Sequence, residues 1–241
     1  MAQFKTQAAT LVRSVALSDF TRHLEFEVSG AAPFRFVPGQ WLSLTAANPE
    51  GEEITRAYSI ASPPENGHIA LCLNRVQDGF MSNHLCSLKE GSSITFQGPF
   101  GNFILHPPMR DTMFIATGTG VAPFRSMLQW LLADPERHHG RELWLLFGAR
   151  TEADLYYRDE FERLAVHYGN FHFLPTLSRG NPEWGGLRGY VQQHVKEIVG
   201  DRKGEDMHAY ICGLDKMVKA NRELLKGMGW DRTSIRYEKY D

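Results

Sequence analysis

The sequence predicts two domains: an antiparallel β-barrel or sandwich, followed by an α/β domain with a parallel sheet. Before residue 106, short alternating segments such as residues 24–28 are separated by regularly spaced turn pairs, among them Pro38-Gly39 and Asp78-Gly79. After residue 111, short apolar runs alternate with helix-like segments, which is typical of a parallel sheet covered on both faces. We therefore expect one domain at residues 1–108 and a second at 109–241.

Each element of the second domain has its own signal. Continuous apolar runs predict buried parallel strands at residues 113–116, 143–147, 171–174 and 209–212. Pro123 suits the first turn of a helix that follows the first of these strands. Further helices are expected over residues 157–168, 190–199 and 214–226.

Composition excludes several classes of protein. The net charge of −2 argues against a nucleic-acid-binding protein, which needs a clearly basic face. No apolar run reaches the roughly 20 residues that span a bilayer, and residues 1–10 lack the apolar core of a signal peptide. We expect a cytoplasmic protein without membrane insertion. The three cysteines, Cys72, Cys86 and Cys212, are too few for a four-thiolate iron–sulfur cluster, and we expect no metal site.

The strongest local signal is the segment Arg56-Ala57-Tyr58-Ser59. A guanidinium fork can pair with a pyrophosphate, a tyrosine ring can lie along a flavin, and a serine hydroxyl can bond the flavin edge. Taken alone, the segment fits equally well an exposed strand before a Pro-Pro turn.

A second signal is the loop Gly118-Thr119-Gly120, which lies between a predicted strand and a predicted helix. Unpaired amides and the helix dipole favour an anion there, and glycine lets the main chain approach a pyrophosphate. The spacing is not that of the Gly-x-Gly-x-x-Gly fingerprint, and a tight turn without a ligand is the alternative. Cys212-Gly213 ends another strand and should face the same crevice, because ligands bind outside the carboxyl ends of parallel strands.

These motifs resemble the ferredoxin–NADP reductase family. Arg56-x-Tyr58-Ser59 followed by Ser62 resembles its flavin-binding motif, and four further segments resemble it in the right order, at residues 36–40, 79–82, 98–103 and 118–123. The resemblance runs from about residue 10 to the C-terminus. It implies an N-terminal antiparallel β-barrel that binds FAD and a C-terminal α/β domain that binds NAD(P).

The resemblance also implies the site residues. Catalytic roles would fall to Cys212, Ser59 and Tyr240. The FAD-binding residues would be Arg56, Tyr58, Ser59, Ile60, Asn74, Arg75, Val76, Gly79, Met81, Ser82, Thr119 and Tyr240. The NAD(P)-binding residues would be Thr117, Gly118, Gly120, Pro123, Arg150, Ser178, Arg179, Arg188, Cys212 and Gly213.

Two features concern specificity and the C-terminus. Arg150, Arg179 and Arg188 could bind a 2′-phosphate as bidentate forks, which slightly favours NADPH over NADH; solvated loop charges are the alternative. Tyr240 stands two residues after Glu238, and in many family members an aromatic residue at this spacing covers the flavin. The extra residue Asp241 departs from that pattern, and a frayed terminus is the alternative.

The function implied by the resemblance is that of a ferredoxin–NAD(P)⁺ reductase. Hydride would pass from the nicotinamide to FAD, and electrons would leave singly to a ferredoxin or flavodoxin, because this chain cannot hold a cluster of its own. We expect a monomer. Two alternatives stay open: a reductase component of an oxygenase or a free-flavin reductase, and an electron-transfer subunit that works only within a larger complex.

Overall fold

The computed structural model describes residues 5–30, 33–64 and 67–240, which form two compact units. The first is built from the described residues of Met1–Leu105 and Ala122–Trp130, the second from those of His106–Val121 and Leu131–Asp241. No helix within the described ranges is long and apolar enough to cross a membrane.

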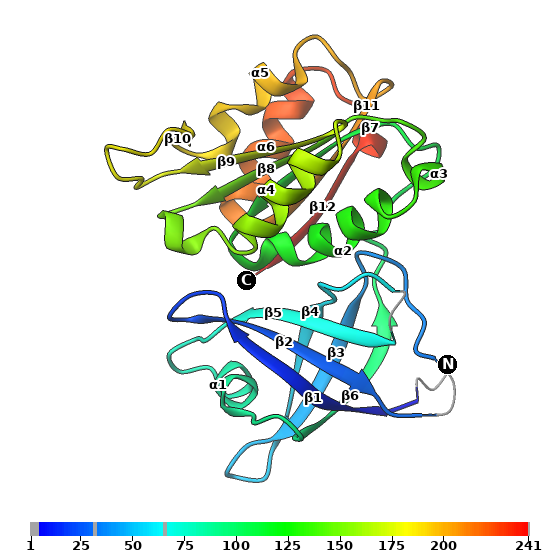
Figure 1. Cartoon of the computed structure of the whole chain (residues 1–241), viewed down its shortest axis with the longest axis vertical. Coiled ribbons are helices and arrows are strands. Elements are labelled where there is room, and N and C mark those ends of the chain that lie inside the picture. The colour runs from blue at the N-terminus through cyan, green and yellow to red at the C-terminus, as the bar shows by residue number, and fades with distance from the viewer. Residues whose placement is uncertain (1–4, 31–32, 65–66, 241) are drawn as a thin grey trace. The chain divides into compact units, whose positions relative to one another are not determined.

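The first unit is an antiparallel β-barrel, as the family resemblance implied (Figure 1). Its strands lie in the order β4-β3-β6-β1-β2-β5, and a bridge between Ile60 and Leu71 joins the end of β4 to β5. The predicted alternation is confirmed on β2, where Leu24 and Phe26 are fully buried in the barrel core. The elements are β1 (Gln7–Ala16), β2 (Thr21–Val28), β3 (Trp41–Ala47), β4 (Glu53–Ser59), β5 (His68–Asn74), α1 (Phe80–Ser87) and β6 (Ser93–Phe100).

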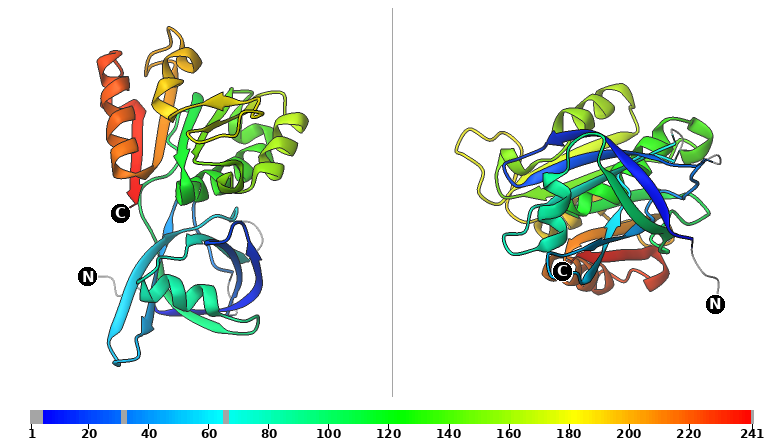
Figure 2. Two further views of the ribbon diagram at one scale, coloured as in Figure 1. Left: turned by 90° about the vertical axis from the view of Figure 1, so that its left-hand side faces the viewer. Right: turned by 90° about the horizontal axis from the view of Figure 1, so that it is seen from below.

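The second unit is a parallel sheet with the strand order β10-β9-β8-β7-β11-β12. Helix α6 lies on one face of this sheet and α4 on the other (Figure 2, left). The strands are β7 (Asp111–Thr117), β8 (Leu143–Ala149), β9 (Phe171–Leu177), β10 (Leu187–Arg188), β11 (Met207–Leu214) and β12 (Ile235–Tyr240). Its α-helices are α3 (Pro135–His138), α4 (Arg158–His167), α5 (Val195–Val199) and α6 (Asp215–Gly227). Helix α2 (Val121–Leu132) follows β7 in the chain, but most of it, Ala122–Trp130, belongs to the first unit. Short 3-10 turns occupy Gly118–Gly120, Glu152–Asp154, Val191–Gln193 and Arg232–Ser234.

The structure confirms the predicted strands and most helices of this unit, but the single helix predicted over residues 190–199 is wrong. A 3-10 turn ends at Gln193, and α5 begins at Val195. The His194 ring at the junction lies 3.0 Å from the carbonyl oxygen of Arg188 and 3.2 Å from Thr176 Oγ1. These anchors to β9 and β10 interrupt the helix. The C-terminal segment is also ordered, because β12 pairs with β11 through Tyr240; Asp241 lies outside the described residues.

A buried histidine on β11 should make the second unit sensitive to acid. His208 is only 6% exposed. Burial, with a smaller contribution from nearby cations such as Arg110, lowers the pKa of His208 from 6.5 to about 4. Between pH 6.5 and about pH 4, His208 is protonated in the unfolded chain but stays neutral in the folded chain. The free energy of unfolding should therefore fall as the pH drops through this window, by on the order of 3 kcal/mol at most, and level off below it.

Urea denaturation of the wild type and of His208→Gln, from about pH 7 to about pH 4, measures this effect. The variant should lose less stability on acidification than the wild type does. Equal acid sensitivity of the two proteins would show that His208 is not the group responsible.

Candidate cofactor-binding sites

Strand β4 presents Arg56 and Tyr58 on one face, because side chains two apart on a strand point the same way. Arg56 is exposed, and its Nη1 donates to the carbonyl oxygen of Thr55 at 2.8 Å. Tyr58 is half-buried, and burial raises its pKa to about 12 despite the opposing charge of Arg56. The phenol is therefore neutral at physiological pH. Ser59 and Ile60, which follow, are buried at 7% and 0% exposure.

A tight loop leads from β5 into α1, and its helix N-terminus is suited to an anion. Gly79 occupies the N-cap without a side-chain acceptor, and the first turn of α1 contains no acidic residue. The first amides and the positive end of the helix dipole are thus left for a ligand. Ser82 Oγ holds the loop by accepting from Val76 N at 3.0 Å and donating to Gly79 O at 3.1 Å. A Cβ at position 79 would come within 2.9 Å of Ser82 Oγ, so the loop requires glycine.

Asn83 is a supporting residue that the sequence analysis missed. Its Nδ2 donates to the carbonyl oxygens of Val76 (2.8 Å) and Gly79 (2.9 Å), and its Oδ1 accepts from Arg75 Nε at 2.9 Å. It therefore shapes the loop and orients an arginine beside it. The available signal was an asparagine in the first turn of a helix, where its side chain tends to bond nearby main-chain groups.

The other residues predicted for FAD differ in their accessibility. Val76 is 57% exposed, whereas Met81 is 3% exposed and belongs to the barrel core. Asn74 Oδ1 accepts from Thr21 Oγ1 at 2.6 Å. Met81 and Ile60 therefore support the site through packing, while the loop main chain and the exposed side chains face solvent.

In the second unit, two glycines allow the turn after β7 to pack closely against the end of its neighbour β11. A Cβ at Gly120 would lie 2.4 Å from the carbonyl oxygen of Cys212, and one at Gly213 would lie 2.3 Å from Thr117 Oγ1. Gly213 also has a φ of +145°, which a side chain would disfavour. Gly118 is different: its φ is +56°, yet a Cβ there would meet nothing within 4 Å. The main chain at Gly118 is thus open to a ligand, as the phosphate-loop prediction requires.

Thr117 Oγ1 is an orphaned polar atom at this turn. It is buried and has no hydrogen-bond partner among the described residues. A buried unsatisfied hydroxyl costs about 1–3 kcal/mol, which a bound ligand could offset by supplying a partner. Thr119 is half-buried beside it, and Pro123 is buried in the first turn of α2. With an open main chain at Gly118 and an unpaired hydroxyl at Thr117, this turn could hydrogen-bond a dinucleotide.

Cys212 lies at the centre of a small polar cluster. It is fully buried, its pKa is raised well above the usual range by burial and by Glu238, and a hydrogen bond with Tyr240 opposes this shift. The thiol is therefore neutral at physiological pH. The structure brings the predicted residues Cys212 and Tyr240 together, while Ser59 belongs to the first unit. It also places Glu238, which the sequence analysis named only for its spacing to Tyr240, opposite Cys212 across β11 and β12.

The three predicted arginines fall into two kinds. Arg150 and Arg179 are held together by a main-chain bond of 2.8 Å, and neither guanidinium has an acidic partner in the part of the chain that the structure describes. Ser178 lies beside them, with its amide bonded to Ala149 O at 3.0 Å. Arg188 instead directs its guanidinium to main-chain carbonyl oxygens of its own loop.

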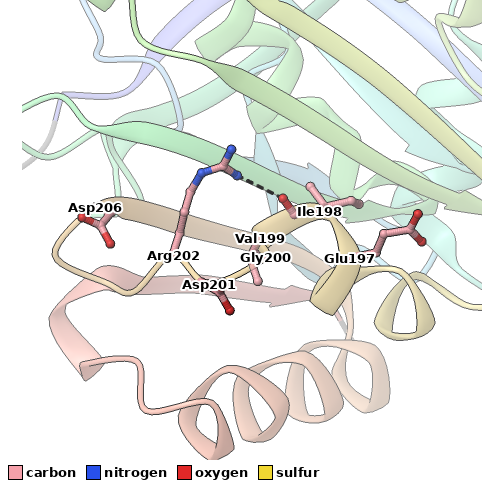
Figure 3. Close-up of a pocket in the computed structure, with 7 residues that line it drawn as sticks. All are labelled: Glu197, Ile198, Val199, Gly200, Asp201, Arg202 and Asp206. Carbon is pink, nitrogen blue, oxygen red and sulfur yellow. Dashed lines mark hydrogen bonds between the residues drawn. The ribbon is translucent and has the colours of Figure 1, made fainter.

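The pocket in Figure 3 is not the dinucleotide crevice. It is lined by residues around the end of α5 and by Asp206, with Arg202 Nη1 donating to Ile198 O at 3.0 Å. Met207, at the start of β11, pairs with the start of β7, whereas Cys212 pairs near the end of β7. The pocket therefore lies at the edge of the sheet opposite the Gly118 turn.

Comparisons with known proteins identify the two domains of this chain. Residues 8–104 match the model of the oxidoreductase FAD-binding domain, and residues 114–223 match that of the oxidoreductase NAD-binding domain. The chain is 43% identical to ferredoxin–NADP reductase B of Sorangium cellulosum over 248 residues, covering 100% of both proteins. The chain belongs to the ferredoxin–NADP reductase family.

Two further similar proteins share less sequence with this chain. The toluate 1,2-dioxygenase electron transfer component of Pseudomonas putida is 30% identical over 241 residues, which cover 98% of this chain and 69% of that protein. A ferredoxin NADP⁺ reductase from Neisseria gonorrhoeae, solved with bound FAD and NADP, shares the fold with a TM-score of 0.85. It is 23% identical, and the match covers 98% of this chain and 99% of that one. The chain is thus an oxidoreductase with an FAD-binding barrel and an NAD-binding α/β domain, as predicted.

Gly118 and Gly140 form a matched pair for testing the dinucleotide turn. Both have a positive φ, +56° and +68°, and neither would crowd a new Cβ within 4 Å. Alanine at either position should therefore cost a similar amount of stability, about 1–2 kcal/mol. Only Gly118→Ala should weaken dinucleotide binding, by at least about tenfold, because its methyl group would occupy the space of the ligand. Titration of NADP⁺ and NAD⁺ checks this, and equal affinities in the two variants would refute the assignment.

Arg56 is expected to retain the flavin. A hydrogen bond to a charged group contributes roughly 1.5–3 kcal/mol, so Arg56→Ala should raise the Kd for FAD by about 10- to 100-fold, and Ser59→Ala by less. Arg13→Ala is the control, because Arg13 on β1 is an exposed arginine that lies three strands from β4 in the sheet. The flavin content after dialysis measures the effect. Full retention by Arg56→Ala would remove this residue from the site.

Proposed function

We propose that this chain passes electrons between NADPH and a one-electron protein carrier of the ferredoxin or flavodoxin type, through bound FAD. The observation that carries the proposal is the similarity over the whole length of ferredoxin–NADP reductase B, in a chain whose two units each offer a helix or turn suited to a phosphate. We assign residues 1–108 to the FAD-binding domain and 109–241 to the NAD(P)-binding domain. Three cysteines cannot hold a four-thiolate cluster, so an iron–sulfur carrier would lie outside this sequence.

In the barrel, this chain's residues hold and orient FAD. The α1 N-terminus and Arg56 would bind the pyrophosphate, with Asn83 keeping the loop in shape. The neutral phenol of Tyr58 would lie along the flavin, and Ser59 would bond its edge. FAD, when bound, supplies a hydride acceptor that can release its electrons one at a time.

In the α/β unit, the chain positions the nicotinamide dinucleotide. The main chain at Gly118 would bind the pyrophosphate, and Thr117 Oγ1 would gain the partner that it lacks. Cys212 contributes a small thiol that is fully buried, neutral and unreactive as a thiolate. Glu238 and Tyr240 set the electrostatics of that thiol.

Preference for NADPH follows from the exposed arginines. A 2′-phosphate carries negative charge that guanidinium groups bind as forks, and Arg150 and Arg179 lie side by side without acidic partners in the described ranges. Ser178 adds a hydroxyl at the same place. NADH lacks the 2′-phosphate, so it would leave these charges without a ligand.

A second candidate function is that of a reductase component serving an oxygenase. The 30% identity to the toluate 1,2-dioxygenase electron transfer component favours it, although that protein is longer than this chain. In that case the chain would still need a separate ferredoxin. The two functions therefore differ in the preferred dinucleotide and in the ultimate acceptor.

The proposal is tested with purified protein. The released flavin is identified, and steady-state turnover is measured with NADPH and NADH against a [2Fe–2S] ferredoxin, a flavodoxin, free FMN and a dye. We expect FAD, at least about tenfold higher kcat/KM with NADPH than with NADH, and faster reduction of a protein carrier than of free FMN. Turnover with the dye alone would indicate a subunit of a larger complex. Preference for free FMN would indicate a flavin reductase.

A further inference from the structure

The loop between β9 and β10 is held in shape by Arg188, which lies in β10 at the end of the loop and bonds main-chain groups within it. Arg188 Nη2 lies within hydrogen-bonding distance of three main-chain oxygens, those of Asn181 (2.9 Å), Pro182 (2.9 Å) and Trp184 (2.8 Å). Its Nη1 lies 3.5 Å from Gly180 O. The Nη2 donors of this exposed arginine are therefore directed to carbonyl groups of the loop. The loop itself extends beyond the sheet beside β10 (Figure 1).

Trp184 fills the inside of the loop. It is 9% exposed, and its indole N–H donates to Leu187 O at 2.8 Å. The guanidinium of Arg158, at the start of α4, lies 5.2 Å from the centre of the indole ring. A Cβ at Gly186 would come within 2.6 Å of that ring, so the loop can wrap the indole only with glycine there.

A carboxylate ties this loop to the turn after β8. Glu152 Oε1 accepts from Asn181 Nδ2 at 2.9 Å, while its Oε2 accepts from Arg158 Nη1 at 2.8 Å. Glu162 completes the arrangement with a 2.7 Å bond to Arg158 Nε. We call Arg188, Trp184, Asn181, Glu152 and Arg158 the loop clamp.

The residues that would bind a 2′-phosphate lie at the start of the same loop. Ser178 and Arg179 precede Gly180 directly, and the amide of Arg179 bonds the carbonyl oxygen of Arg150. The loop clamp therefore determines where the Arg179 side chain leaves the main chain. The Nη2 group of Arg188 is engaged by carbonyl groups of the loop, although the residue as a whole is exposed.

We propose that Arg188 is a positioning residue for NADPH specificity: it shapes the loop so that Arg150 and Arg179 meet the 2′-phosphate, which Arg188 itself does not contact. This rests on the proposed use of NADPH. Trp184 shares the positioning role, although it is uncharged and buried.

Binding of adenosine 2′,5′-bisphosphate, a minimal probe that carries the 2′-phosphate, is measured by calorimetry at several salt concentrations. Arg179→Gln should weaken binding at least about tenfold and reduce its salt dependence, because it removes a charge that contacts the phosphate. Arg188→Gln and Trp184→Leu should weaken binding by similar factors while leaving the salt dependence as in the wild type. Arg163→Gln, an exposed arginine on α4, controls for loss of charge and should change neither.

A second measurement does not depend on the ligand. The Arg179–Gly180 bond is a trypsin site inside the loop, and the loop clamp should protect it. Arg188→Gln, Trp184→Leu and Asn181→Ala should each be cut there at least about tenfold faster than the wild type, at unchanged flavin content. If the wild type does not bind the probe, the proposed NADPH preference is wrong. The rate of trypsin cleavage alone then shows whether the loop clamp holds the loop in shape. The inference is overturned if Arg188→Gln lowers the salt dependence as Arg179→Gln does, or if it leaves both binding and cleavage unchanged.

Discussion

The close contact between the turn after β7 and the end of β11 is the constraint on which the proposed dinucleotide site depends. Because β7 and β11 are neighbouring parallel strands, their carboxyl ends lie at one edge of the sheet, and the turn that follows β7 passes the end of β11. Glycine at 120 and at 213 allows the close contact, since a Cβ at either position would overlap Cys212 O or Thr117 Oγ1. The contact places an open main chain, an unsatisfied hydroxyl and a neutral thiol within one small region.

Both units hold their proposed phosphate-binding elements in the same way, with a side chain that bonds main-chain carbonyl groups. In the barrel, Asn83 from the first turn of α1 holds the loop before Gly79. In the α/β unit, Arg188 holds the loop after Arg179. In each case the side chain that shapes the loop is distinct from the groups proposed to bind the ligand. Such support keeps binding groups in place before the ligand arrives, which reduces the entropy lost on binding.

Burial separates neutral groups from charged ones around the two sites. Tyr58 and Cys212 both have raised pKa values, chiefly because of burial, and both are neutral at physiological pH. The positive charges that would meet phosphates are exposed arginines such as Arg56 and Arg179. This division suits ligands whose reactive rings are flat and largely apolar and whose phosphates are strongly charged.

The sequence by itself determined the two-part fold, the strand order along the chain and the motifs of both sites, because these depend on local patterns. Alternation on β2, apolar runs at β7 and β8, and the Gly118 turn are all properties of neighbouring residues. The helix predicted over residues 190–199 was wrong because His194 bonds residues of β9 and β10, which a local pattern does not contain. Likewise, only the tertiary structure decided that Glu238 lies beside Cys212, that Asn83 shapes the loop before α1, and that Arg188 bonds carbonyl groups of its own loop. Each of these depends on where a side chain points and on which main-chain groups the fold brings within its reach.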